Sequence, residues 1–95
     1  FLRLLRMILE KCEAAGTPVS FCGEAAGRSV PALALAALGF RELSMRGVSI
    51  GRVKRMLRAS DLTELSGAIA AAEGAGARSA RETVRGWARD NGVPL

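Results

Sequence analysis

Two short strand-forming segments, separated by one helix-forming segment, constrain the fold of this chain most strongly. Residues 18–22 contain β-branched and aromatic side chains between two glycines, and residues 42–45 form a second candidate strand. Between them, residues 31–38 are apolar on nearly all sides and are followed by Gly39, which predicts a buried helix. Because a helical crossover separates the strands, we expect them to pair in parallel as a right-handed βαβ unit.

Helical patterns account for most of the remaining chain. Residues 1–15 place apolar side chains along one face and predict a first helix that stops at Gly16, whereas residues 23–29 are predicted to be a loop. Three further helices are predicted to begin at the N-cap residues Ser49, Asp61 and Ser79, the last two with a glutamate three residues later. Two parallel strands do not form a self-supporting sheet, so this topology predicts further strands outside these residues.

Composition excludes several kinds of chemistry. The 95 residues contain no histidine, which removes Ser/His and Cys/His nucleophile pairs and histidine-ligated metal sites. Two cysteines are too few for a disulfide framework, and no signal peptide or long apolar segment is evident. We therefore expect a cytoplasmic protein with reduced thiols and no membrane partner.

The positive charge of the chain is concentrated in one stretch. The formal net charge is +5, and residues 41–58 account for all of it, with six basic side chains against Glu42 alone. Such a patch attracts phosphate groups of nucleic acids, metabolites or phosphoproteins, although a solvated helix face gives the same pattern.

The position and chemistry of Cys22 make it a candidate catalytic residue. It lies where a predicted strand ends, and ligands collect at the carboxyl ends of strands in parallel α/β folds. Gly23 and Gly27 allow a tight turn and a close approach of substrate. A thiol has an ordinary pKa of about 8.5, so without a neighbouring base it is a better acid than nucleophile. The alternative is a buried, inert cysteine.

Three segments carry a resemblance to a known family. They are Pro-Val-Ser-Phe-Cys-Gly-Glu-Ala-Ala-Gly at 18–27, Ala-Leu-Gly-Phe-Arg-Glu-Leu-Ser-Met at 37–45 and Ser-Ile-Gly-Arg-Val-Lys at 49–54. Together they resemble the C-terminal end of the phosphoenolpyruvate-binding barrel of phosphoenolpyruvate-protein phosphotransferase. This is enzyme I of the sugar phosphotransferase system or its nitrogen-related paralogue. Pyruvate phosphate dikinase and phosphoenolpyruvate synthase share the Cys-Gly-Glu element and are close alternatives.

The resemblance implies a role for each matching residue. In that family a phosphoryl group passes from phosphoenolpyruvate to a histidine on a separate domain, and a cysteine matching Cys22 protonates the enolate of pyruvate. Gly23 and Glu24 would shape the site. Arg46 stands where the family usually has a small residue, and it either binds substrate phosphate or is simply solvated. The family's Mg²⁺ ligands and phosphate-binding arginines lie on strands earlier than those present here.

The fold expected from the resemblance is an α/β class fragment, the C-terminal part of a (β/α)8 TIM-type barrel, mostly helical with two short parallel strands. Residues 1–60 would be the last barrel units, and residues 61–95 the closing helices. The implied partners are phosphoenolpyruvate or pyruvate and, through a missing N-terminal domain, a phosphocarrier protein. Open strand edges predict a homo-oligomer. The chain lacks the phosphorylated histidine, so we expect it to be inactive alone.

Two alternatives belong to other functional classes. Residues 31–58 also match a helix-turn-helix DNA-binding module, with a basic second helix, but this requires residues 42–45 to be helical. The other alternative is a small structural or oligomerisation module without a site. If the chain is a barrel fragment, we expect no nucleic-acid partner.

Overall fold

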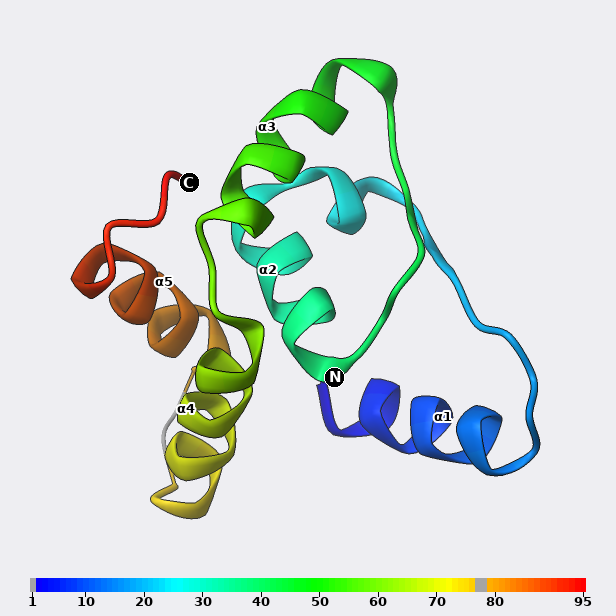
Figure 1. The fold of residues 1–95 in the computed structure, drawn as a ribbon. Helices are drawn as coiled ribbons and strands as arrows, with labels where there is room; N and C mark the ends of the chain where they lie inside the picture. The colour runs from blue at the N-terminus through cyan, green and yellow to red at the C-terminus, as the bar shows by residue number, and fades with distance from the viewer. Residues whose placement is uncertain (1, 77–78) are drawn as a thin grey trace.

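Helices make up most of the chain, and two very short strands connect them (Figure 1). The computed structural model describes residues 2–76 and 79–95, so Phe1 of the predicted first helix lies outside the described residues. The elements in chain order are α1 (Leu2–Ala14), β1 (Phe21–Cys22), the 3-10 helix η1 (Glu24–Gly27), α2 (Ser29–Leu38), β2 (Leu43–Ser44), α3 (Gly47–Arg58), α4 (Leu62–Gly74) and α5 (Ala80–Asp90).

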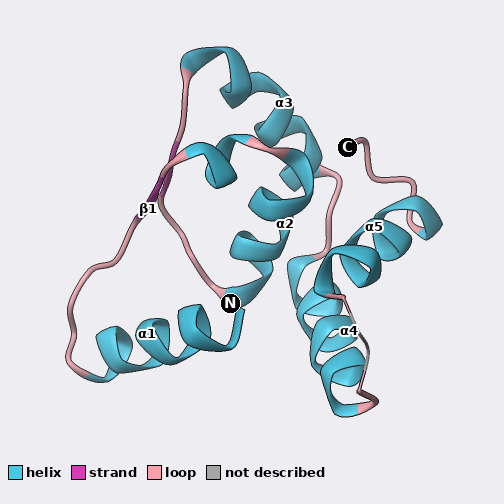
Figure 2. Cartoon of the chain, turned by 180° about the vertical axis from the view of Figure 1, so that it is seen from behind, coloured by secondary structure: helices cyan, strands magenta, loops and turns pink. Residues whose placement is uncertain are grey.

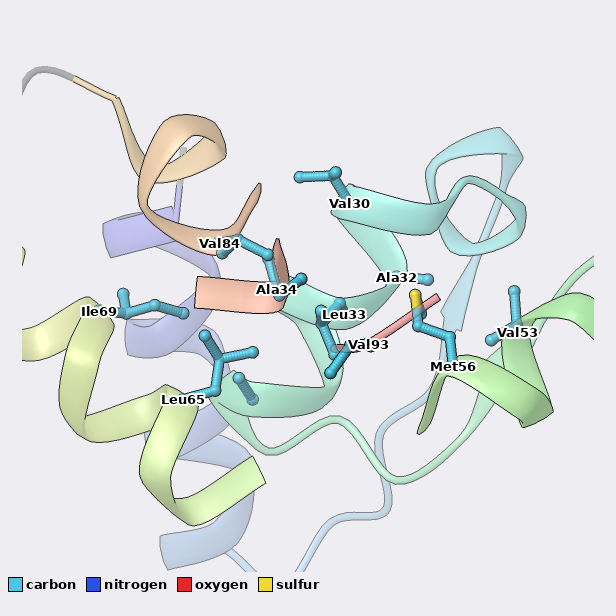
Figure 3. Packing of buried hydrophobic residues seen from close by; sticks show 12 residues of the cluster. Val30, Ala32, Leu33, Ala34, Val53, Met56, Leu65, Ile69, Val84 and Val93 are labelled. Carbon is cyan, nitrogen blue, oxygen red and sulfur yellow. The ribbon is translucent and has the colours of Figure 1, made fainter. Parts of the chain in front are cut away.

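The central helix α2 organises the main hydrophobic core. Its sequence is apolar on nearly every side, and the other three C-terminal helices pack around it (Figure 3). Leu33 of α2 is fully buried, and Met56 of α3, Leu65 of α4 and Val84 of α5 are at most 1% exposed. We name this group of buried side chains the main core, which comprises Val30, Ala32, Leu33, Ala34, Ala37, Val53, Met56, Leu65, Ile69, Val84, Ala88 and Val93.

Helix α1 and the strands depend on a smaller core. Leu5 and Leu9 of α1 pack with Leu35 of α2 and with Phe40, which follows α2, and we name these four residues the second core. The ring of Phe40 meets the ring of Phe21 edge to face, with centroids 5.7 Å apart. Aromatic pairs favour this geometry. The second core therefore connects the first helix to the strand that carries Cys22.

The two strands pair in parallel, as predicted (Figure 2). Phe21 is opposite Leu43 and Cys22 is opposite Ser44. The backbone amide of Phe21 also donates a hydrogen bond to the carbonyl of Glu42, with an N···O distance of 2.9 Å. The strands are shorter than the predicted segments 18–22 and 42–45. Strand β1 keeps its predicted end at Cys22, whereas β2 ends one residue early, at Ser44.

The helix-turn-helix alternative is wrong, because residues 42–45 are not helical. Leu43 and Ser44 form β2, and an extended segment connects α2 to α3. Leu43 is held in this conformation by pairing with β1 and by packing against both cores.

Two predicted helix starts are confirmed and two are wrong. The side chains of Asp61 and Ser79 accept hydrogen bonds from the amides of residues 64 and 82, as their capping patterns predicted. Ser49, however, lies inside α3, because its amide already donates to the carbonyl of Arg46 at 2.9 Å. Helix α2 begins two residues before Pro31, which is compatible with proline since first-turn amides need no helical partner. The predicted loop 23–29 contains the turn η1.

No helix among residues 2–76 and 79–95 is long and apolar enough to cross a membrane.

An ion pair joins α1 to α4. Arg6 donates to the carboxylate of Glu73 with an N···O distance of 2.8 Å. This hydrogen bond, more than the charge attraction, holds the pKa of Glu73 below its ordinary value of 4.5 and raises the pKa of Arg6. A lowered carboxylate pKa stabilises the fold above the unfolded pKa, and the contribution is lost as pH falls through the folded pKa.

We expect Glu73→Gln to lower the free energy of unfolding at pH 7 by less than about 1 kcal/mol, because both side chains are about one-third exposed. Urea denaturation at pH 7 and at about pH 3 checks this. The difference from the unsubstituted chain should be smaller at the lower pH and should also shrink in high salt. An equal difference at both pH values would contradict the assignment.

Candidate functional site

Cys22 occupies the carboxyl end of β1 and is exposed as a free thiol. Cys22 is therefore not buried, whereas the alternative of an inert cysteine required burial. The neighbouring Phe21 side chain is half-buried in contact with the second core, so the alternation along β1 directs successive side chains to different environments.

The chain reverses immediately after Cys22. Gly23 has φ 139°, a conformation that L residues with side chains rarely adopt, and it precedes η1. Within η1, Ala26 is fully buried, whereas Glu24 is exposed. The turn is therefore exposed at Gly23 and Glu24, next to the thiol, and is buried against the protein at Ala26.

A cavity of about 640 Å³ lies at the carboxyl ends of both strands. Two glycines and two serines contribute little side-chain volume to its walls, and three arginines lie around it. Its lining residues are Gly23, Glu24, Gly27, Arg28, Ser44, Met45, Arg46, Ser49 and Arg52. The structure thus brings together Gly23, Glu24 and Arg46, which the sequence proposed as substrate-binding residues. Cys22 is not among the lining residues, but it is bonded to Gly23, which is.

Three cavity residues were not singled out from the sequence. Arg28 belonged to the predicted loop, Ser49 was interpreted as a helix cap, and Arg52 was one of the six basic residues of the segment 41–58. The signal that would have found Arg52 is its place within the Ser-Ile-Gly-Arg-Val-Lys segment at 49–54. Nothing in the sequence around Arg28 indicates that η1 brings it to the ends of the strands.

The cavity is electrostatically suited to an anion. Across residues 2–76 and 79–95, no carboxylate lies within ion-pair distance of Arg28, Arg46 or Arg52. Helix α3 begins at this cavity with Arg46 as its N-cap and has no side-chain capping hydrogen bond. The positive end of a helix dipole and nearby guanidinium groups both favour phosphate or carboxylate.

The described residues do not form a metal centre. No group of three or more cysteine, aspartate or glutamate side chains is placed to hold a metal ion in that part of the chain. Glu24 is the one carboxylate among the cavity's lining residues. Hard divalent cations such as Mg²⁺ need several oxygen ligands, so these residues do not fit a magnesium site.

Comparison with known proteins identifies relatives over the first two-thirds of the chain. The family model described as "PEP-utilising enzyme, PEP-binding domain" matches residues 1–62. The chain is 43% identical over 63 residues to the protein named "Phosphoenolpyruvate-dependent phosphotransferase system" from Salmonella typhimurium and equally to that from Escherichia coli, covering 66% of this chain and 8% of each relative. It is 37% identical over 65 residues to "Phosphoenolpyruvate-protein phosphotransferase" from Latilactobacillus sakei, covering 68% of this chain and 11% of the relative.

These matches span only about a tenth of the length of the relatives. No solved structure matches the chain. The resemblance predicted from the Cys-Gly-Glu, Ser-Met and Ser-Ile segments is confirmed, since all three lie within the matched residues 1–62. The chain therefore belongs to the family of PEP-utilising enzymes, in which it matches the PEP-binding domain.

Proposed function

We propose that this chain forms the C-terminal part of the phosphoenolpyruvate-binding barrel of a phosphoenolpyruvate-protein phosphotransferase. The family match and the names of the relatives support the reaction class. The observation that carries the proposal is the exposed Cys22 thiol at the carboxyl end of β1, directly before a turn that lines an arginine-rich cavity. The parallel pair β1–β2 supports the barrel, whose strands are all parallel.

In the proposed reaction a longer polypeptide transfers the phosphoryl group of phosphoenolpyruvate to one of its own histidines. The bond between phosphorus and the enol oxygen breaks, a phosphorus–nitrogen bond forms, and the enolate of pyruvate remains. Cys22 then gives its proton to the methylene carbon, which becomes the methyl group of pyruvate. The resulting thiolate recovers a proton from solvent, to which Cys22 is exposed.

The cavity residues have binding roles in this proposal. The guanidinium group of Arg46 attracts the phosphate or carboxylate of the substrate, and Gly23 lets the backbone turn beside it. Glu24 shapes the rim of the cavity and takes no part in proton transfer. Carboxylates elsewhere in the longer polypeptide hold the Mg²⁺ on which the family depends. None of the steps assigned to Cys22 passes through that ion.

The proposal also names partners. Phosphoenolpyruvate and pyruvate are the small-molecule partners, and a phosphocarrier protein accepts the phosphoryl group from the histidine-bearing domain. By itself the 95-residue chain is inactive, because it has no histidine to phosphorylate. Each strand has one edge not paired within the sheet β1–β2, which favours self-association of this chain into a homo-oligomer. We place the reaction in the cytoplasm.

The test is transfer of labelled phosphate. The longer polypeptide containing these residues is incubated with Mg²⁺ and phosphoenolpyruvate carrying radioactive phosphorus, and label on the protein is measured before and after acid treatment. We expect an acid-labile label, because phosphohistidine hydrolyses in acid, and release of pyruvate in equal amount. The 95-residue chain alone serves as the control and should acquire no label. Pyruvate release without label on the longer polypeptide would contradict the proposal.

A further inference from the structure

The turn after Cys22 is attached to the rest of the molecule at its C-terminal end, at Ala26 and Gly27. Its start is exposed at Cys22, Gly23 and Glu24, whereas Ala26 is fully buried. The carbonyl oxygen of Gly27 accepts a hydrogen bond from Nη2 of Arg52, with an N···O distance of 2.6 Å. Across the described part of the chain, this is the one side-chain hydrogen bond that reaches residues 21–28.

Arg52 extends from a helix whose position is fixed by the main core. The next residue along α3, Val53, is 2% exposed, and Met56 is 1% exposed, so both anchor α3 against α2. Helix α3 also approaches the turn closely, because a Cβ atom added to Gly27 would lie 3.2 Å from Oγ of Ser49. The Arg52 guanidinium therefore connects a rigid helix to the segment that follows the thiol.

We propose that Arg52 is a positioning residue for Cys22: by donating to the Gly27 carbonyl, it fixes η1 on α3 and thereby sets where the thiol lies relative to the cavity. The catalytic part of this role rests on the proposed function, whereas its effect on the turn does not. A guanidinium donor makes a stronger hydrogen bond to a carbonyl than a neutral donor does. Without it, no side-chain hydrogen bond among the described residues reaches the turn, which is then held by the buried Ala26 and by packing of η1 against the neighbouring helices and strands.

The chain offers a matched control for this inference. Arg55 lies on the same helix, is exposed like Arg52, and makes no side-chain hydrogen bond within the described residues. Arg52→Ala and Arg55→Ala therefore remove the same charge from the same helix, but only the first removes a contact with the turn. Arg52→Lys keeps the charge and an N–H donor group, so it tests whether a different cation can restore the bond to the Gly27 carbonyl.

Amide hydrogen exchange of the 95-residue chain tests the effect on the turn. The reporters are the amides of Ala26 and Arg28, which donate to the carbonyls of Gly23 and Ala25. We expect exchange at both to be about tenfold faster in Arg52→Ala, less than twofold faster in Arg55→Ala and intermediate in Arg52→Lys. Unchanged exchange at the turn, or an equal increase throughout α2, would overturn the inference, because the first shows no restraint and the second a general loss of stability.

Exchange of the pyruvate methyl protons in the longer polypeptide tests the effect on catalysis. We expect Arg52→Ala to lower kcat about tenfold with a smaller rise in KM for pyruvate, because Arg52 also lines the cavity, and Arg55→Ala to change neither. A normal kcat in Arg52→Ala would overturn the positioning role. If the unsubstituted polypeptide exchanges no protons, the proposed function fails, and amide exchange alone then decides whether Arg52 fixes the turn.

Discussion

Replacing Cys22 with alanine in the longer polypeptide is expected to slow exchange of the pyruvate methyl protons with solvent by about 100-fold or more. The reason is that the Cys22 thiol at the carboxyl end of β1 is the proposed proton donor, and alanine has no exchangeable proton. In the proposed reaction run from pyruvate, the thiolate removes a methyl proton before any other bond changes. The measurement is the loss of the methyl signal in D₂O by proton NMR.

Two comparisons make this result specific. Cys12→Ala removes the other free cysteine, which is half-buried on α1, and should leave exchange unchanged. Transfer of the phosphoryl group from phosphoenolpyruvate to the protein should be less affected by Cys22→Ala than the reverse reaction, because the phosphorus–oxygen bond can break before the enolate is protonated. Normal proton exchange in Cys22→Ala would contradict the proton-donor role.

The second large effect concerns the fold. Leu33→Ala is expected to lower the free energy of unfolding by about 2–5 kcal/mol, because it removes a fully buried side chain from the centre of the main core. Native domains are stable by only about 5–15 kcal/mol, so this loss is a large part of the total. Urea denaturation of the 95-residue chain, followed by circular dichroism at 222 nm, measures it.

Leu4→Ala is the matched control, since it removes the same atoms from a side chain that is 54% exposed on α1. We expect a change within about 0.5 kcal/mol there. If the two substitutions had equal effects, the described packing of α2 at the centre of the molecule would be wrong.

The parallel strands and the location of Cys22 were predictable because their signals are local. Two short strand-forming segments separated by a helix of crossover length allow few topologies, and a parallel βαβ unit is one of them. In the structure this unit pairs Cys22 with Ser44. The caps at Asp61 and Ser79 were predictable for the same reason, since each bonds to an amide three residues away.

The parts that sequence reasoning missed depend on contacts between distant residues. The bond from Arg52 to the Gly27 carbonyl spans 25 residues of sequence, and the bond from Arg6 to Glu73 spans 67. A local sequence pattern therefore predicts neither bond. Ser49 shows the opposite error: its local cap pattern is plausible, but α3 begins two residues earlier at Gly47. The arginine-rich cavity forms between residues 23–28 and residues 44–52, which are distant in the sequence, and this is why only part of its lining was predicted.

The division of the buried side chains into two groups has a consequence for motion. Helix α1 and β1 are held by the second core, whose members Leu5, Leu9, Leu35 and Phe40 are far fewer than those of the main core, whereas Leu43 of β2 packs against both cores. Proteins open in cooperative units whose cost scales with the apolar contacts each unit would lose. The N-terminal unit can therefore detach while the four-helix remainder stays folded. We therefore expect the thiol to move with the unit that opens first, whereas Arg52 stays on α3 with the main core.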